Sequence, residues 1–391
     1  MEDIIFLIFW VSVGMVVYAY VGYPACLMGL SLFRKSGRVE TDSKGWELPR
    51  VSFIITAYNE EKQIAEKLQR TLSQDYPQEK LEIIVASDCS TDKTDIIVEG
   101  FGRGRIKLVR APERRGKEFA QKYAIEIAKG DILIFSDVAT SLDVQGLRTI
   151  IQNFKDPSIG CVSSEDRFID AEGNISGEGI YVKYEMFLRK LESQVNSLVG
   201  LSGSFFAARR SVCCHNWATD LPSDFNTLLN TIRSNMKGVI DPATIGYYKN
   251  ITDEKKEFNR KVRTVLRGIS VFMRNFSLLN PWRYGLFSWQ LFSHKLCRWM
   301  VPFFLIIIMF TNILLVQRTG YLFLLLIQGG FYSISLFWYI LRDTAWAKEG
   351  HKMISWVKIP FFFISVNSAI ALAWWKYAMG DRATFWEPSK R

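Results

Sequence analysis

The chain has 391 residues, which is long for one domain, and its apolar residues gather towards its two ends. Hydrophobic residues make up 49% of the sequence and aromatic residues 14%, proportions typical of a protein with lipid-facing helices. The formal net charge of +10 comes without a basic tail, so it favours a membrane surface and a diphosphate ligand over nucleic acid. The six cysteines show no CxxC spacing and indicate neither a zinc site nor a disulfide framework.

Residues 1–35 are expected to form a transmembrane anchor. Residues 4–33 contain no Lys, Arg, Asp or Glu and exceed the about 20 residues that cross a bilayer core. A cleaved signal peptide would begin with basic residues and be shorter, whereas this chain begins with Glu2 and Asp3. The positive-inside rule then places the amino terminus outside and the next domain in the cytosol, because basic residues follow the anchor: Arg34, Lys35, Arg38 and Lys44.

Residues 36–280 are expected to form a cytoplasmic α/β domain with a mainly parallel sheet. Short β-branched runs alternate there with amphipathic helical stretches. Polar clusters follow three of the expected strands, at residues 56–60, 87–92 and 136–140. Because ligands bind at the carboxyl ends of strands in open α/β sheets, we expect these clusters to converge on one crevice.

Asp88 and Asp137 each end an apolar strand, where a lone carboxylate costs desolvation energy unless it is paired. Helix capping is the alternative explanation for part of these clusters, since Asn59, Ser90, Thr91 and Asp137 are good N-cap types that precede expected helices. Carboxylates that meet in a cleft suit a divalent cation bridging a diphosphate. No GxGxxG motif follows a strand and no P-loop motif occurs, which argues against dinucleotide and P-loop chemistry.

The carboxyl-terminal region, residues 299–391, is expected to contain about three more membrane spans. The apolar runs 299–316, 321–341 and 354–375 are each long enough to cross a bilayer. Before them, residues 281–298 mix Trp, Phe and Leu with basic residues, a composition typical of a helix lying in the membrane interface.

The number of expected spans and the basic residues near the carboxyl terminus predict opposite sides of the membrane for the tail. Four spans place the carboxyl terminus outside and the loop 342–352 in the cytosol, yet the basic residues Lys376, Arg382, Lys390 and Arg391 favour a cytosolic tail. A re-entrant apolar segment is the alternative.

Four motifs then occur in the order and at the spacing of a known family: TAYNE at residues 56–60, SDCSTD at 87–92, RGK at 115–117 and FSD at 135–137. They resemble the inverting family 2 glycosyltransferases. The anchor, central domain and carboxyl-terminal helices are arranged as in membrane-bound bacterial polysaccharide synthases, similar to cellulose, hyaluronan and poly-N-acetylglucosamine synthases. The resemblance implies a nucleotide-diphospho-sugar transferase (GT-A) fold and a nucleotide diphosphate sugar donor, with a UDP-sugar expected.

On the donor side, the resemblance implies a set of nucleotide-sugar-binding residues. Asp88 accepts a hydrogen bond from the base, Lys117 lies near the nucleotide, and the remaining members are Ala57, Tyr58, Glu60 and Asp92. Asp137 matches the first carboxylate of the family's metal-binding Asp-x-Asp, for Mg²⁺ or Mn²⁺, whereas Ala139 replaces the second.

On the acceptor side, Gly203 and Ser204 begin a stretch that resembles the family's Gly-Ala-x-x-Ala strand. Residues 221–225 resemble the Glu-Asp motif that carries the general base, with Ser223 in place of the Glu and Asp224 retained. The alternative role of Asp224 is to cap the following helix.

Arg260 and Arg263 stand where processive members carry Gln-x-x-Arg-Trp. Arg263 can clamp a pyrophosphate, while the Trp that contacts the acceptor sugar is replaced by Thr264. Plain surface charge is the alternative for both arginines.

The expected function is transfer of a hexose or N-acetylhexosamine to a polysaccharide or lipid-linked acceptor at the bacterial inner membrane. A polyprenyl phosphate acceptor is the second reading, and a catalytically inactive scaffold the third. Retention of Asp88, Asp137 and Asp224 argues against the scaffold. Should Asp224 not be the base, Glu165 and Asp166 are the next candidates.

Overall fold

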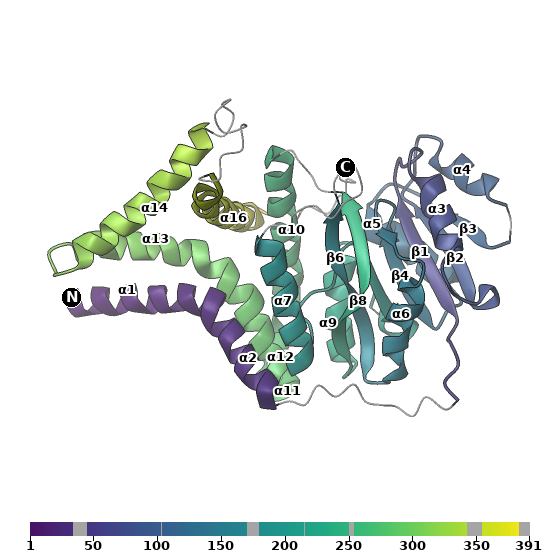
Figure 1. Cartoon of the computed structure of the whole chain (residues 1–391), viewed down its shortest axis with the longest axis horizontal. Coiled ribbons are helices and arrows are strands. Elements are labelled where there is room, and N and C mark those ends of the chain that lie inside the picture. Colours follow the sequence, from purple (N-terminus) through teal and green to yellow (C-terminus); the bar gives the residue numbers. More distant parts are fainter. Residues whose placement is uncertain are drawn as a thin grey trace. The chain divides into compact units, whose positions relative to one another are not determined.

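The computed structural model describes residues 1–33, 45–102, 104–169, 180–214, 216–249, 254–341 and 354–382. The described residues divide into two units (Figure 1). The sheet unit contains residues 27–249 and 270–290, and the helical unit contains residues 1–26, 254–269 and 291–382.

The sheet unit is built on an eight-stranded mixed sheet in the order β3-β2-β1-β4-β7-β6-β8-β5. The parallel pairs are β1 with β2, β1 with β4, β2 with β3, and β6 with β8, whereas β7 and β5 run antiparallel to their neighbours. The predicted α/β fold with a mainly parallel sheet is therefore confirmed. The strands are β1 (Val51–Ala57), β2 (Leu81–Ser87), β3 (Ile106–Arg110), β4 (Ile132–Asp137), β5 (Ser141–Leu142), β6 (Ile159–Ile169), β7 (Phe205–Arg209) and β8 (Lys237–Lys249).

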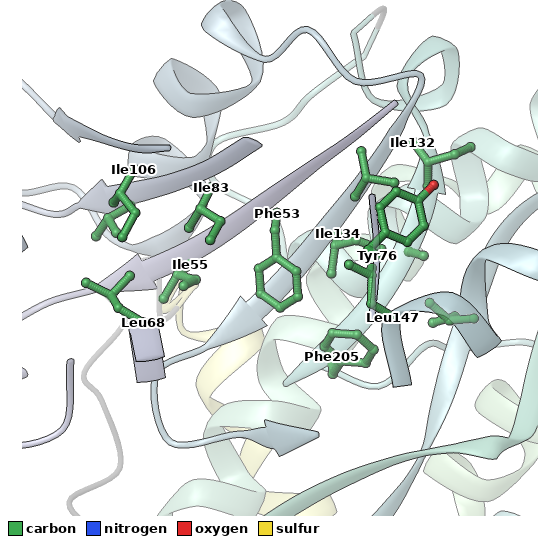
Figure 2. Close-up of a cluster of buried hydrophobic side chains, with 14 of the residues drawn as sticks. Phe53, Ile55, Leu68, Tyr76, Ile83, Ile106, Ile132, Ile134, Leu147 and Phe205 are labelled. Carbon is green, nitrogen blue, oxygen red and sulfur yellow. The ribbon is translucent and has the colours of Figure 1, made fainter. Parts of the chain in front are cut away.

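Two layers of helices cover the sheet (Figure 1). On one face lie α3 (Ile64–Leu72), α4 (Thr94–Gly100) and α6 (Gly146–Gln152). The other face is covered by α5 (Lys117–Ile127), α7 (Ile180–Val195), α8 (Arg210–Cys214) and α9 (Ser223–Arg233). Every residue of β1 is buried, so Phe53 and Ile55 pack on the first face and Ile54 on the second. Figure 2 shows Phe53 among side chains of neighbouring strands, where its burial contributes about 2 kcal/mol.

The register of the parallel strands aligns their carboxyl ends. Ala57 of β1 lies opposite Ser87 of β2, and Thr56 lies opposite Asp137 of β4. The three polar clusters that follow these strands consequently lie at one edge of the sheet, as predicted.

The helical unit contains most of the apolar helices. Among the described residues, four helices are long and apolar enough to cross a membrane: Glu2–Phe33, Leu286–Leu314, Tyr321–Leu341 and Ile359–Ala378. Their elements are α1 (Glu2–Val17), the π-helix Tyr18–Gly22, α2 (Tyr23–Phe33), α12 (Leu286–Leu291), the π-helix Phe292–Cys297, α13 (Arg298–Leu314), α14 (Tyr321–Leu341) and α16 (Ile354–Ala378). Phe9 of α1 packs on Tyr321 with ring centroids 5.2 Å apart, and Arg318 pairs with Glu2 and Asp3.

The expected interfacial segment, residues 281–298, begins with α11 (Pro281–Tyr284) and then enters the second candidate span. That span has 29 residues, which corresponds to a helix about 44 Å long, whereas a bilayer core is about 30 Å thick. The helix is therefore long enough for its first turns to lie in the membrane interface. The chain reaches it from α10 (Glu254–Arg274) through a 3₁₀ turn at Phe276–Leu279.

Several residues used for the topology prediction lie outside the described part of the chain: Arg34, Lys35, Arg38, Lys44, the loop 342–352, Lys390 and Arg391.

Candidate active site

The loops that follow β1 and β2 are bonded to each other at the carboxyl edge of the sheet. Asn59 Oδ1 accepts the Thr91 N–H at 2.8 Å, and the Asn59 N–H donates to Ser90 Oγ at 3.2 Å. Asn59 has a φ of 53°, a left-handed conformation that few non-glycine residues adopt. These polar residues therefore connect two loops instead of capping the helices that follow them, which corrects the capping alternative at Asn59, Ser90 and Thr91.

Asp92 lies in the second of these loops. Its carboxylate accepts the Thr94 N–H at 2.9 Å at the start of α4 and the Glu61 N–H at 3.1 Å. Burial acts to raise the pKa of Asp92, but the bonds from Thr94 and Glu61 outweigh it and lower that pKa. Asp92 thus stabilises the loops, and its predicted contact with the nucleotide sugar stays a prediction.

Asp88 holds the RGK motif against the end of β2. Its carboxylate is fully buried and accepts the backbone N–H groups of Arg115 and Gly116, each at 3.1 Å. Burial raises the pKa of Asp88, and these two bonds oppose the rise. Gly116 has a φ of 102°, which explains why the motif carries a glycine. The bonds place Lys117 at the first turn of α5.

Ala57 and Tyr58 lie beside this motif at the end of β1. Ala57 is fully buried, while Tyr58 is half-buried with the Arg114 guanidinium 3.9 Å from its ring centroid. An aromatic ring and a cation at a strand end suit a nucleoside diphosphate.

Lys117 connects the end of β4 to the loop that precedes β7. Its side chain is 7% exposed, and Nζ lies 2.5 Å from Asp137 Oδ1 and 2.8 Å from the Gly203 carbonyl oxygen. The Asp137 N–H donates to the Ser204 carbonyl at 3.0 Å. The structure therefore brings together four of the predicted residues: Lys117, Asp137, Gly203 and Ser204.

Asp224 lies against the same loop. A Cβ built on Gly203 would be 3.4 Å from Asp224 Oδ2. The N-cap residue of α9 is Pro222, with no side-chain cap bond, and Asp224 is the second residue of the helix. The N-cap alternative for Asp224 is consequently wrong, although its charge still favours the helix amino terminus. The buried Glu118 accepts the Ser223 N–H at 3.4 Å and takes over part of the capping.

Glu60 carries the largest upward pKa shift on the donor side. Burial, with the negative charges of Asp137 and Asp92, raises its pKa to about 7. No sequence pattern indicates this high pKa, since it depends on burial in the fold and on the approach of Asp137 from another strand.

The site fits a divalent cation only in part. No group of three or more His, Cys, Asp or Glu able to hold a metal occurs among the described residues, and Ala139 offers no carboxylate. However, burial and then the negative charges of Asp137 and Asp92 raise the pKa of Glu60, and a divalent cation in these surroundings would stabilise its ionised carboxylate.

Lys67 is a buried residue near the site that our sequence analysis did not identify. Its ammonium donates to Ser136 Oγ at 2.7 Å and to the Thr140 carbonyl, on either side of the turn that carries Asp137. Burial lowers the pKa of Lys67 to about 7. The sequence pattern that could have indicated this burial is the helical spacing of Lys67 from Ile64, Leu68 and Thr71, which places it on the buried face of α3.

Arg260 and Arg263 lie in α10, within the part that belongs to the helical unit. Arg260 pairs with Glu257 on the same helix at 2.8 Å. The predicted role of these two arginines at the nucleotide sugar stays a prediction.

Residues 52–215 match the family model described as Glycosyl transferase family 2. The chain is 29% identical over 182 residues to the poly-beta-1,6-N-acetyl-D-glucosamine synthase of Staphylococcus aureus, covering 45% of this chain and 43% of that protein. The corresponding synthase of Staphylococcus epidermidis is 26% identical over 221 residues, covering 55% and 50%. The chain thus matches about half the length of these relatives.

Among solved structures, mannosyltransferase PcManGT from Pyrobaculum calidifontis, in complex with GDP-Man and Mn²⁺, resembles this chain with a TM-score of 0.70 at 19% identity. The match covers 93% of this chain and 99% of that one. The predicted GT-A fold is confirmed by this likeness, which at such low identity concerns the fold alone.

Proposed function

We propose that this chain, whose residues 52–215 match glycosyltransferase family 2, transfers a hexose or N-acetylhexosamine with inversion. The donor is a nucleotide diphosphate sugar, and the acceptor is a saccharide or a lipid-linked molecule at a membrane. One observation carries the proposal: Lys117 binds both Asp137 and the Gly203 carbonyl, and Gly203 lies against Asp224. A proposed donor-side carboxylate and a candidate base are therefore connected through Lys117 and Gly203.

The proposed reaction is a single displacement. Asp224 takes the proton of an acceptor hydroxyl as its oxygen bonds to the anomeric carbon, and the bond to the nucleoside diphosphate breaks with its electron pair on the phosphate oxygen. Inversion needs one base and no protein nucleophile. Lys117 offsets negative charge where the leaving diphosphate forms.

Asp137 and Glu60 are the proposed ligands of Mg²⁺ or Mn²⁺ together with the donor diphosphate. The cation would neutralise charge on the departing nucleotide. The proposal is supported by the surroundings of Glu60, where burial and then the nearby carboxylates of Asp137 and Asp92 raise its pKa to about 7, so that a cation there would stabilise the ionised form.

The proposed setting is a bacterial inner membrane with the sheet unit on the cytoplasmic side and the four apolar helices as anchor. A polyprenyl phosphate acceptor is the second candidate, favoured by Thr264 in place of the Trp that contacts the acceptor sugar in processive relatives. The inactive scaffold has no support, because the carboxylates at positions 88, 137 and 224 lie at the site.

The test is a donor screen with the full chain in detergent or nanodiscs. UDP- and GDP-sugars are supplied with membrane lipid and oligosaccharide acceptors, and release of nucleoside diphosphate is measured. We expect one donor to be consumed, with product in the lipid extract or in the polymer fraction according to the acceptor. Failure of every donor to react would contradict the proposal.

A further inference from the structure

The loop 201–204, between α7 and β7, touches three residues to which we assign chemistry. The Gly203 carbonyl accepts the Lys117 ammonium, the Ser204 carbonyl accepts the Asp137 N–H, and Gly203 packs against Asp224. The position of this loop therefore sets the distance between the donor side and the proposed base.

Ser202 fastens the loop to β6. Its hydroxyl donates to Asp166 Oδ1 at 2.6 Å, and its N–H donates to Ser163 Oγ at 2.8 Å. Ser202 is fully buried and Asp166 is 9% exposed. A hydrogen bond to a carboxylate in such surroundings is stronger than one between neutral groups.

Asp166 is also held from the side of α7. Its Oδ2 lies 3.9 Å from Arg189 Nη1, and Ser164 Oγ donates to Oδ1 at 3.3 Å. Burial raises the pKa of Asp166, while Arg189 and the hydroxyl groups oppose the rise. Burying the Asp166 carboxylate costs desolvation energy, and its bonds connect α7 and β6 to the loop 201–204.

We propose that Asp166 is a positioning residue for sugar transfer: through Ser202 it holds the loop 201–204 so that Lys117 and Asp224 face one reaction centre. The inference rests on the proposed function, and on Asp224 as its base. It assigns Asp166 an indirect role and not the role of a substitute base.

Asp166→Asn and Ser202→Ala test the hydrogen bond between these two side chains by changing its acceptor and its donor in turn. Asp241→Asn is the matched control, because Asp241 is 3% exposed in β8, pairs in register with Ser164, and accepts bonds from Thr244 and Asn153 at 2.7 and 3.1 Å. Steady-state kcat and donor KM are measured on the full chain in detergent. The kcat values are normalised to the amount of folded protein, and thermal unfolding is measured for each variant.

We expect kcat to fall about 10-fold or more in both test variants, with donor KM within about 3-fold of the parent, since a displaced catalytic group slows the reaction without removing donor contacts. Asp241→Asn should keep the parent kcat. The double variant Asp166→Asn with Ser202→Ala should be no slower than the slower single variant, because Asp166→Asn weakens and Ser202→Ala removes the same hydrogen bond.

The positioning role would be overturned if Ser202→Ala kept the parent kcat. It would also be overturned if the loss of kcat in the double variant were the product of the losses in the two single variants. If Asp166→Asn does not fold, Ser202→Ala alone decides, since it removes one hydroxyl. If the Asp166→Asn and Ser202→Ala variants keep the parent kcat while Asp224→Asn loses it, only this inference is refuted. A parent chain that consumes no donor refutes the proposed function instead.

Discussion

Gly203 lies so close to Asp224 that a Cβ at position 203 would be 3.4 Å from the Asp224 Oδ2 atom. That separation is an ordinary van der Waals contact, so the fold has room for one methyl group there. The same methyl group would cover part of the carboxylate that we propose as the base. A side chain at position 203 should therefore restrict access to Asp224 at little cost in stability.

Gly203→Ala should lower the rate of transfer about 10-fold, and Gly203→Val should lower it further, because larger side chains displace the acceptor hydroxyl from the base. Donor binding, measured by calorimetry, should change little. Gly100→Ala is the control, since a Cβ there meets nothing within 4 Å. Transfer by Gly203→Val at the parent rate would place the acceptor elsewhere.

A divalent cation should be required for transfer. EDTA should abolish the reaction and Mn²⁺ or Mg²⁺ should restore it, because Asp137 offers a carboxylate beside the donor diphosphate site. Asp137→Ala should reduce turnover by roughly 10²-fold, the cost typical of losing one charge-stabilising group. Undiminished activity in chelator, or in Asp137→Ala, would remove the cation from the mechanism.

The pH dependence of stability should carry the signature of Glu60. Its folded pKa of about 7 is above the ordinary glutamate pKa of 4.5, so the folded state binds the proton more tightly than the unfolded state. Its contribution to stability is complete below pH 4.5 and is lost as pH rises through about 7. In EDTA, Glu60→Gln should therefore gain Tm relative to the parent as pH rises from 5 to 8.

Mn²⁺ should reverse this loss in the parent chain, because a cation lowers the cost of ionising Glu60. Melting temperatures from pH 5 to 8, with and without Mn²⁺, check both statements. Parallel Tm curves for the parent and Glu60→Gln would contradict the assigned pKa.

The strand-end carboxylates could be predicted from the sequence because each depends on local pattern. Asp88 and Asp137 follow apolar runs, and parallel strands bring their ends together. The bond from Lys117 to Gly203 joins residues 86 positions apart, a distance over which periodicity says nothing. The high pKa of Glu60 likewise depends on charges brought close by the fold.

The start of α9 cannot be read from local residue types for a different reason. Asp224 is a good N-cap type, and capping of the following helix is the alternative role that the sequence offers for it. Pro222 instead takes the N-cap position, since its fixed φ suits the entry to a helix, and Glu118 reaches the Ser223 N–H from another helix. Capping by a group remote in sequence cannot be recognised from local residue types.

Topology gives a prediction for the loop 342–352, which lies outside the described part of the chain. It should be cytoplasmic, like the sheet unit, because basic residues follow the first span and Glu2 and Asp3 precede it. Single cysteines placed there and at exposed sites of the sheet unit, in a cysteine-free chain, should resist a membrane-impermeant label applied from outside. A cysteine placed before α1 should react, and labelling of the loop would reverse the orientation.

Asp224→Asn separates the role of a base from that of a helix-terminal charge. Asn keeps the shape of the side chain and loses its charge, so the loss of interaction with the helix amino terminus should cost about 0.3–1 kcal/mol and a small fall in Tm. As the base, Asp224 should matter far more for turnover, because positioned proton transfer contributes typically about 10²–10⁴.

We therefore expect Asp224→Asn to lower kcat by roughly 10²-fold or more, with donor affinity near that of the parent. Asp220→Asn is a matched control on the loop before α9, where Asp220 pairs with Arg274 at 2.6 Å on the surface. It should lose a little stability and no turnover. Equal kcat values for the two variants would make Asp224 structural, and the base would then be sought at Glu165, which pairs with Lys190 at 2.8 Å, before Asp166, to which we assign a positioning role.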